Sequence, residues 1–312
     1  MFAEDKADLC VFYCLSPLHA GTGQAVGAVD LPIQRERHTA WPQVQASGVK
    51  GAFRDWFLRY WLVNGAPCRN NGLQAKELTD KVFGKAEKAD DSPGQSDGQA
   101  GAVSVSDARL LAFPVRSNVA PFVWVTCPAV ITRLKRDVAL ALSKQPVPII
   151  SPTKEDNYVS VTGDIKEAVV LEDLAVSSEK RPEDTPELAE LFKRLAPQVT
   201  RLLVISDACF SFLVRTATEI QPQIQIEFDT GTTKDGSLRY QELLPSDSVL
   251  YTLVFFGQER TENSGLLRDV IRAHVKTAIG SHIRMGGDMT MGRGLMEVQW
   301  ITDTPAAEAP NV

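Results

Sequence analysis

Asp30 and His19 are the two residues in this sequence whose types best suit acid–base chemistry. A carboxylate can accept a proton, and an imidazole changes charge near neutral pH. Asp30 is followed closely by Arg35 and Arg37, and guanidinium groups bind phosphates and carboxylates through paired hydrogen bonds. The stretch therefore predicts a site for an anionic ligand, with Asp30 placed to react with it.

Each of these residues also has a structural interpretation. A single histidine is often a structural residue, and Asp30 can form an internal ion pair that only orders its loop. No Ser/His/Asp triad, Walker loop or set of metal ligands offers a competing site, because the four histidines lack zinc-binding spacing. Both interpretations stay open from the residues alone.

Two glycine-rich segments with nearby arginines lie at opposite ends of the chain. The first, GTGQAVG, is bracketed by Pro17 and Pro32 and precedes no helix, which argues against a dinucleotide fingerprint. Glycine lets the backbone approach a phosphate closely, although a plain turn remains the alternative. The candidate ligand-binding residues of the two segments are Gly21, Gly23, Arg284, Gly286, Gly287, Gly292, Arg293 and Gly294.

These loops need strands to hold them together. We predict strands at Leu9–Leu15 and Leu295–Trp300, and if these are neighbours in one sheet, both loops can line one groove. Ser47 is a plausible N-cap for a helix from Val49 to Val63, with Lys50 and Arg54 largely off its aromatic stripe. Further strands are predicted at 109–115, 122–126, 202–205, 213–220, 223–228 and 249–256, and helices at 129–142 and 265–279. Irregular segregation of these elements favours an α+β fold.

Three segments are predicted to be irregular, and a fourth to form a β-hairpin. Residues 84–107 are low in complexity and predict a disordered insertion, and residues 306–312 predict a frayed tail. In the segment DTGTTKDGSLRYQELLP, Asp235-Gly236 predicts a β-hairpin with a tight turn. The proline-rich and acidic stretch 146–186 is expected to be irregular, with one or two edge strands.

Composition and charge bound the possible partners. The 312 residues are 44% hydrophobic and 23% charged. No apolar run is long enough to span a membrane, so no transmembrane helix is predicted. The net charge of −6 is unevenly spread, since Glu155–Glu190 carries −8 and Ile33–Arg59 carries +3. A local positive field is enough to bind a polyanion. Five cysteines without a CxxC pair indicate reduced thiols in a cytoplasmic protein.

The order of these residues resembles a known family. SPLHAGTG…GAVDLPIQRERHTAWPQVQASGVKGAFR closely resembles the N-terminal signature of the backbone subunit of the type III-B CRISPR effector, the Cmr complex, in the RAMP superfamily. DARLLAFPVRS, KDGSLRYQELLP and MGGDMTMGRGL resemble its later blocks in the same order. The resemblance implies a single ferredoxin-like (RRM-like) palm over residues 1–312, with long insertions that include a thumb-like β-hairpin.

The resemblance also implies roles for individual residues. Asp30 matches the catalytic aspartate, and His19 falls on the histidine of the first loop. Lys50 and Arg54 match the guide-RNA-binding start of the first helix, and Gly292–Gly294 the glycine-rich loop. The candidate thumb is residues 230–244, with Lys234, Arg239 and Tyr240 as its candidate RNA contacts. Arg239 and Gln241 depart from the aromatic residue and the acid expected there.

The implied function is a metal-dependent endoribonuclease, with Asp30 as a possible Mg²⁺ ligand. Copies of the chain would stack along a CRISPR guide RNA with other Cmr subunits and cut a complementary single-stranded target RNA every six nucleotides. Two alternatives stay open: a purely structural RNA-binding scaffold, and a guide-processing ribonuclease of the same superfamily. The second usually needs a His/Tyr/Lys acid–base set, of which the sequence shows no clear example.

Overall fold

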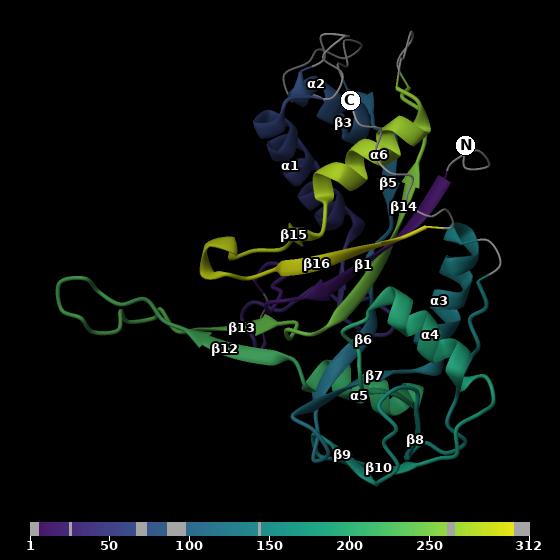
Figure 1. The fold of residues 1–312 in the computed structure, drawn as a ribbon. Helices are drawn as coiled ribbons and strands as arrows, with labels where there is room; N and C mark the ends of the chain where they lie inside the picture. Colours follow the sequence, from purple (N-terminus) through teal and green to yellow (C-terminus); the bar gives the residue numbers. More distant parts are fainter. Residues whose placement is uncertain are drawn as a thin grey trace.

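The central feature of the fold is a large mixed β-sheet. The computed structural model describes residues 6–24, 27–66, 74–85, 98–142, 145–260 and 266–302. Within these residues, twelve strands form one sheet, whose main path runs β15-β16-β1-β14-β6-β7-β11-β8-β10-β9 and starts at the short strand β15 (His282–Arg284). Figure 1 shows helices on both sides of this sheet, and the α+β class expected from the sequence is confirmed.

One half of the sheet forms a palm around the N-terminal strand. β1 pairs antiparallel with β14 and with β16, and β14 pairs antiparallel with β6. Helix α1 connects β1 to β6 and helix α6 connects β14 to β16, with insertions, which is the split β-α-β order of a ferredoxin-like sheet. The bounds of these elements are β1 Lys6–Cys14, α1 Ala46–Asn64, β6 Ala108–Arg116, β14 Val249–Phe256, α6 Arg268–Ile279 and β16 Leu295–Ile301.

Apolar burial holds α1 against this palm. The helix buries Val49, Phe53, Phe57 and Trp61, whose spacing of four residues places them on one face. Phe53 is fully buried, and its ring lies 6.1 Å from those of Phe12 on β1 and Trp300 on β16. The helix begins after Gln45 rather than Ser47, and the residue before it makes no side-chain cap.

The other half of the sheet is built from the middle of the chain. Its strands are short, and helices α3, α4 and α5 belong to the same part of the chain. The bounds are β7 Phe122–Thr126, α3 Pro128–Ala141, β8 Asn157–Ser160, β9 Val169–Leu171, β10 Leu174–Ser178, α4 Thr185–Leu195, β11 Leu202–Ile205 and α5 Asp207–Thr216.

The strand predicted at residues 213–220 is wrong over its first part, because α5 extends through it. The Ser206 hydroxyl accepts a hydrogen bond from the Cys209 amide at 3.2 Å and caps the helix. Phe210, Leu213 and Val214 are buried at helical spacing, so tertiary packing overrides the β-branched character of the segment.

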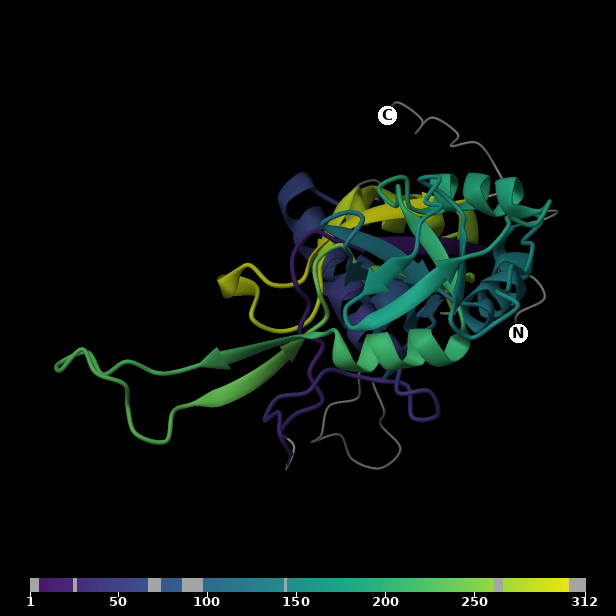
Figure 2. The same cartoon turned by 90° about the horizontal axis from the view of Figure 1, so that it is seen from below.

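A separate two-stranded hairpin projects from this body, as Figures 1 and 2 both show. It consists of β12 (Glu219–Gln223) and β13 (Arg239–Leu243), paired antiparallel from Glu219↔Leu243 to Gln223↔Arg239. The hairpin starts earlier than the predicted range 230–244. The prediction missed its first strand because the polar sequence EIQPQ lacks the pattern that would reveal a strand. Asp235-Gly236 forms a turn within the loop, whereas the chain reverses near residues 227–232.

Parts of the predicted insertion at 84–107 are ordered. β3 (Gly84–Lys85) pairs with β4 (Gln99–Ala100), and β5 (Val103–Val105) pairs with β14 in the main sheet. The expectation of disorder thus differs from the structure at both ends of the range, since Val103 is buried and contributes to the core. Residues 86–97 and the tail 306–312 lie outside the described residues.

The cysteines expected to be reduced are free thiols where the structure describes them. Cys10, Cys14 and Cys127 are buried, and Cys209 is partly buried. Burial raises the pKa of Cys14 to about 12, which keeps this thiol protonated and unreactive near neutral pH. Cys68 lies outside the described residues. No helix in the described part of the chain has the length and apolarity needed to cross a membrane.

Candidate functional site

The two glycine-rich segments meet beside the ends of β1 and β16. These strands pair as the sequence analysis required, from Leu9↔Ile301 to Cys14↔Met296. The Gly287 amide donates a hydrogen bond to the His19 carbonyl oxygen at 2.8 Å, and the Gly294 amide donates to the Pro17 carbonyl oxygen at 2.9 Å. The predicted proximity of the two loops is therefore confirmed.

Two of the glycines are required by close packing, Gly286 between the two loops and Gly294 within the second loop. Gly286 has φ +82°, and a Cβ atom there would lie 2.5 Å from the His19 carbonyl oxygen. Gly294 has φ +68°, and a Cβ atom there would lie 1.8 Å from the Met285 carbonyl oxygen. Any side chain would separate the loops or distort the backbone, because L-residues rarely adopt this φ region.

His19 is held by the base of the hairpin. Its Nδ1 atom lies 2.9 Å from the Glu242 carbonyl oxygen, which can only accept, so Nδ1 carries the hydrogen. The remaining ring nitrogen, Nε2, lies where a Cβ atom on Gly21 would be only 2.6 Å away. Gly21 therefore leaves room beside the second nitrogen of the imidazole.

Asp30 is also held by β13, at Tyr240, two residues before the Glu242 that holds His19. Its Oδ2 atom accepts a hydrogen bond from the Tyr240 backbone amide at 2.7 Å. Leu31 then pairs with β13 in the parallel sense, because its amide donates to the Tyr240 carbonyl at 3.1 Å and its carbonyl accepts from the Glu242 amide at 3.0 Å. Strand β13 thus positions both candidate acid–base residues through its backbone.

Asp30 opens onto a groove of about 700 Å³ between the first loop and the hairpin. Lys234 and Arg239, two of the candidate thumb residues, line the same groove. Arg239 donates two hydrogen bonds to Gln223 Oε1, at 3.3 and 3.2 Å, which orient its guanidinium along the hairpin. A carboxylate facing two cations across an open groove suits a polyanionic ligand.

The two arginines after Asp30 have different environments. Arg35 donates to Glu242 Oε1 at 2.5 Å and to the carbonyl oxygens of Ala40 and Val214 at 2.7 and 3.0 Å. Its guanidinium is therefore satisfied inside the protein. Arg37 is exposed, and no hydrogen bond or ion pair to it is found among the described residues. Of the two, Arg37 is the one whose charge is available to a ligand.

Glu242 has a structural importance that the sequence analysis missed. The residue is 6% exposed, and besides Arg35 it accepts hydrogen bonds from the Thr218 hydroxyl at 2.9 Å and from the Ile33 amide at 3.0 Å. Its carboxylate thus ties the loop that carries Asp30 to the base of the hairpin. The contacts with Arg35 and Ile33 join residues more than 200 positions apart, and no local pattern reveals them.

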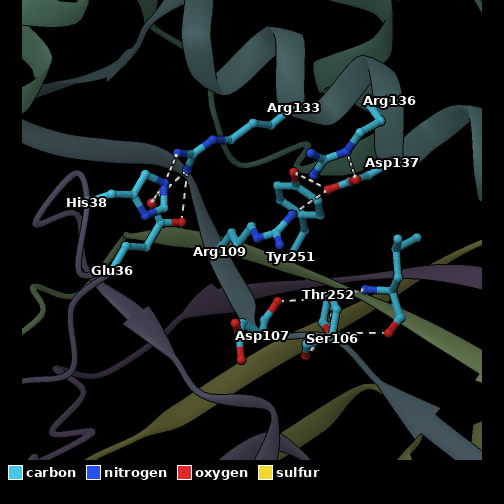
Figure 3. A network of polar contacts seen from close by, with 11 residues as sticks. Glu36, His38, Ser106, Asp107, Arg109, Arg133, Arg136, Asp137, Tyr251 and Thr252 are labelled. Carbon is cyan, nitrogen blue, oxygen red and sulfur yellow. Dashed lines mark hydrogen bonds and ion pairs between the residues drawn. The ribbon is translucent and has the colours of Figure 1, made fainter.

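A further polar network anchors the end of this loop to helix α3, as Figure 3 shows. Arg133 donates to both carboxylate oxygens of Glu36, at 2.9 and 2.8 Å, and its second amino group lies 3.1 Å from His38 Nε2. The same guanidinium lies 4.7 Å from the centre of the Trp41 ring. The segment after Asp30 is therefore fixed at both of its ends.

The second cluster in Figure 3 is buried under α3. Asp137 is 3% exposed and accepts hydrogen bonds from Tyr251 at 2.9 Å, from Arg109 at 3.1 Å and from Arg136 at 2.8 Å. Burial, followed by the Asp137 charge, raises the pKa of Tyr251 well above its usual value. The tyrosine stays protonated, so this cluster holds α3 to the sheet rather than supplying an acid or a base.

Lys50 and Arg54 line a second pocket, of about 680 Å³, between α1 and the segments that carry β3, β4 and β5. Arg54 donates to Asp80 Oδ1 at 2.5 Å and to the Gly84 carbonyl oxygen. Lys85 and Arg260 line the same pocket, and sequence reasoning did not single them out. The described residues thus gather four basic side chains around one opening.

The second glycine-rich loop contributes its arginines to other contacts. Arg284 donates to the Met289 carbonyl oxygen at 2.7 Å and lines a cavity of about 390 Å³ with Trp56 and Arg59. Arg293 donates to Gln221 Oε1 on β12. Gly292 has φ +79° with open space around it, so it serves the turn rather than a close contact.

The hairpin also exposes apolar side chains to an unusual extent. Phe228 is 100% exposed near the turn of the hairpin. Ile224, Ile226, Leu238 and Tyr240 are between 41% and 54% exposed. The sequence offered one signal for this surface, because the segment IQIEF carries bulky apolar residues in an otherwise polar stretch. Such exposure on a projecting element indicates a binding surface.

Asp30, the candidate metal ligand, shares its groove with one other carboxylate, that of Asp235. Within the described residues, no group of three or more His, Cys, Asp or Glu side chains could hold a metal ion. One carboxylate is nevertheless compatible with Mg²⁺, which is usually bound by one or two carboxylates together with substrate phosphates and water. The donor set fits a site that a phosphate-bearing ligand would complete.

Comparisons with known proteins agree with this geometry. A family model described as the RAMP superfamily matches residues 11–297. The chain is 33% identical over 303 residues to a Pyrococcus furiosus protein named CRISPR system Cmr endoribonuclease Cmr4, with 94% of this chain and 95% of that protein covered.

Solved structures are similar over nearly the whole chain. The crystal structure of oligomeric Cmr4 from Pyrococcus furiosus has a TM-score of 0.67 and 26% identity, covering 96% of this chain and 99% of that one. The cryo-EM structure of the Type III-B Cmr-beta bound to cognate target RNA contains a chain with a TM-score of 0.71 and 20% identity, covering 96% and 98%. The family match spans the β1 loop, the hairpin and the second glycine-rich loop, and the chain belongs to the RAMP superfamily.

Proposed function

We propose that this chain is a guide-RNA-binding backbone subunit of a type III-B CRISPR effector and that it cleaves the target RNA paired with the guide. One observation carries the proposal: the Asp30 carboxylate is fixed to the hairpin backbone by Tyr240 at 2.7 Å and lines a groove that also contains Lys234 and Arg239. The endoribonuclease name of the Pyrococcus relative supports it.

The nucleophile in this reaction is the 2′-hydroxyl of the target RNA itself. Its oxygen attacks the adjacent phosphorus, a new O–P bond forms, and the bond from phosphorus to the 5′-oxygen breaks. Asp30 accepts the proton of the 2′-hydroxyl, and His19 in its protonated form gives one to the leaving 5′-oxygen. The products are a 2′,3′-cyclic phosphate and a 5′-hydroxyl, so that atoms and charge balance.

The hairpin supplies the geometry that this attack needs. Helical RNA does not align its 2′-hydroxyl with the leaving oxygen, so one nucleotide must be displaced before cleavage. The hairpin projects from the body (Figure 2), and Phe228 with its apolar neighbours is exposed along its connecting loop, where these side chains can separate stacked bases. The loop around Asp30 adjoins the base of the same hairpin, which would place the carboxylate beside the displaced nucleotide.

Guide RNA would run along the basic surfaces of the palm. Lys50, Arg54, Arg37 and Arg284 supply positive charge, and Gly286 and Gly287 let the second glycine-rich loop pack against His19 beside this surface. Copies of the chain would stack along the guide with other Cmr subunits in the cytoplasm. Regular stacking would repeat the hairpin, and hence the cut, every six nucleotides.

Mg²⁺ is the divalent cation that we propose for this site. As the alternative to accepting the proton, Asp30 would hold this ion together with a phosphate oxygen of the RNA, and the ion would lower the charge on the phosphate. Removal of divalent ions with EDTA, followed by addition of Mg²⁺ alone, tests this proposal. Full cleavage in EDTA would show that the side chains act without a metal.

The test of the function is cleavage of a labelled guide-complementary RNA by the reconstituted complex with and without Asp30→Asn. The amide keeps the hydrogen bond to Tyr240 but cannot accept the proton, so we expect cleavage to fall by about 10²–10⁴-fold. Guide binding and assembly should be unchanged. Asp235→Asn, which alters another carboxylate lining the same groove, is the matched control and should cleave normally.

The outcomes separate the alternatives. If Asp30→Asn abolishes assembly, or if the variant cleaves as well as the parent complex, the chain is a scaffold and Asp30 only orders its loop. If the isolated chain cuts hairpin precursor RNA without a target, it is a guide-processing ribonuclease. Cuts at six-nucleotide spacing that disappear in the variant support the target nuclease.

A further inference from the structure

Strand β13 forms side-chain hydrogen bonds on both of its faces, one set to the first loop and one to the second glycine-rich loop. Adjacent residues on a strand point to opposite faces. Gln241 and Glu242 are adjacent on β13, and their side chains bond to different loops. Glu242 bonds to Arg35 and Ile33 in the first loop, whereas Gln241 donates from Nε2 to Asp288 Oδ2 in the second loop at 2.5 Å. The strand between them carries the amide that holds Asp30.

The contact between Gln241 and Asp288 is a shielded one. Gln241 is 2% exposed, and its Oε1 atom accepts a hydrogen bond from the Gln223 side chain on the partner strand of the hairpin. Both ends of the amide are therefore used. A hydrogen bond between a neutral donor and a carboxylate is among the stronger kinds, and its loss in a buried position is costly.

Asp288 is itself held in an uncommon backbone conformation. Its φ is +57°, in the left-handed region, and its carbonyl oxygen accepts from the amides of Met291 at 2.9 Å and Arg293 at 3.3 Å. The loop that presents the carboxylate is thus a defined turn. Arg293 adds a second link, since it donates to Gln221 on β12. The second glycine-rich loop therefore touches both strands of the hairpin, as the proximity of the yellow and green ribbons in Figures 1 and 2 illustrates.

From these contacts we infer that Gln241 and Asp288 are positioning residues for Asp30. The path has three steps: Asp288 fixes the Gln241 side chain, Gln241 fixes the backbone of β13, and the adjoining Tyr240 amide fixes the Asp30 carboxylate. This inference rests on the proposed function. It also accounts for the departure at position 241, because an acid there would face the Asp288 carboxylate.

The sharpest test is a pair of substitutions that exchange the charge. Gln241→Glu changes one atom of the side chain but sets two carboxylates 2.5 Å apart, where like charges repel strongly. In the double variant with Asp288→Asn, the new amide can donate to the new carboxylate, so the contact is restored in reverse. Asp288→Asn alone keeps an acceptor for Gln241 and serves as the conservative control.

We expect Gln241→Glu to lower the kcat of target cleavage about tenfold or more while leaving the KM for target RNA and guide binding unchanged. The double variant should recover most of the rate, and Asp288→Asn, which exchanges the charged acceptor of Gln241 for a neutral one, should lower the rate less than Gln241→Glu does. A defect in kcat that the double variant does not relieve would overturn the inference. So would loss of guide binding or assembly in Gln241→Glu, because the pair would then be a structural contact only.

A second measurement does not depend on activity. Hydrogen exchange in the peptide that contains residues 239–243 reports how firmly the Tyr240 amide is held by Asp30. We expect faster exchange in Gln241→Glu and recovery in the double variant. If Asp30→Asn cleaves normally, the proposed function fails, and this exchange pattern still decides whether the pair fixes the strand. Unchanged exchange in Gln241→Glu would refute it.

Discussion

The palm and the hairpin are held by opposite kinds of interaction. The palm buries whole side chains between sheet and helices, and Phe12, Phe53 and Phe57 are fully buried there. The hairpin forms a separate two-stranded sheet, exposes Phe228 completely, and is fixed at its base by hydrogen bonds to two loops. Stability and activity should accordingly depend on different residues.

The largest effect should come from the palm. Phe53→Ala removes a fully buried ring that lies 6.1 Å from both Phe12 and Trp300, so we expect a loss of about 3–5 kcal/mol in the free energy of unfolding. Urea unfolding followed by circular dichroism measures it. Phe212→Ala, at a phenylalanine that is 42% exposed, is the control and should cost less than about 0.5 kcal/mol. Similar losses of unfolding free energy in both variants would contradict the expectation that stability depends on the buried rings of the palm.

The next effect should come from the tip of the hairpin. Phe228→Ala removes an exposed ring, so unfolding should be unaffected, whereas target cleavage should slow by about tenfold if the ring stacks on bases. Single-turnover cleavage by the reconstituted complex gives the rate. Phe212→Ala again provides the control, because its ring is exposed on α5 away from the hairpin strands. A normal cleavage rate in Phe228→Ala would show that the ring does not reach the RNA.

The smallest effect should come from a single charge on the palm. Lys50→Ala is expected to weaken guide RNA binding at every sequence and to lower the slope of log affinity against log salt by about one unit. Filter binding at several salt concentrations measures the slope. Lys135→Ala, at an exposed lysine on α3, should leave the slope unchanged. Equal changes in the two variants would indicate diffuse attraction rather than a defined contact.

Much of the main sheet was predictable because several of its strands, in both halves, have a local signature. Leu9–Leu15, Phe122–Thr126, Leu202–Ile205 and Val249–Phe256 are short apolar runs, and each lies on a strand with bounds within a few residues. The pairing of β1 with β16 could be proposed from the two glycine-rich segments that flank them, and it is confirmed. By contrast, β12 contains Pro222 and has no buried apolar face, so the sequence did not predict its pairing with β13.

The chemistry of the site was predictable only as residue types. Asp30 and His19 could be chosen from the sequence, but the groups that hold them are backbone atoms of Tyr240 and Glu242, which have no signature. Arg35 was expected to face RNA, and the structure instead places its guanidinium against Glu242. Arg35 is next to Glu36 in the sequence, but its ion-pair partner is Glu242, 207 positions away, and no sequence pattern reveals that partner.

The central place of β1 in the sheet has a consequence for how the protein is made. Both of its neighbours, β14 and β16, come from the last quarter of the chain, beginning at Val249. A nascent chain leaving the ribosome therefore carries the apolar strand β1 without these two neighbours until Val249 and the residues after it have been synthesised. His19 and the loop at Gly287 meet only when that final segment has folded, so an unfinished chain cannot assemble the pocket.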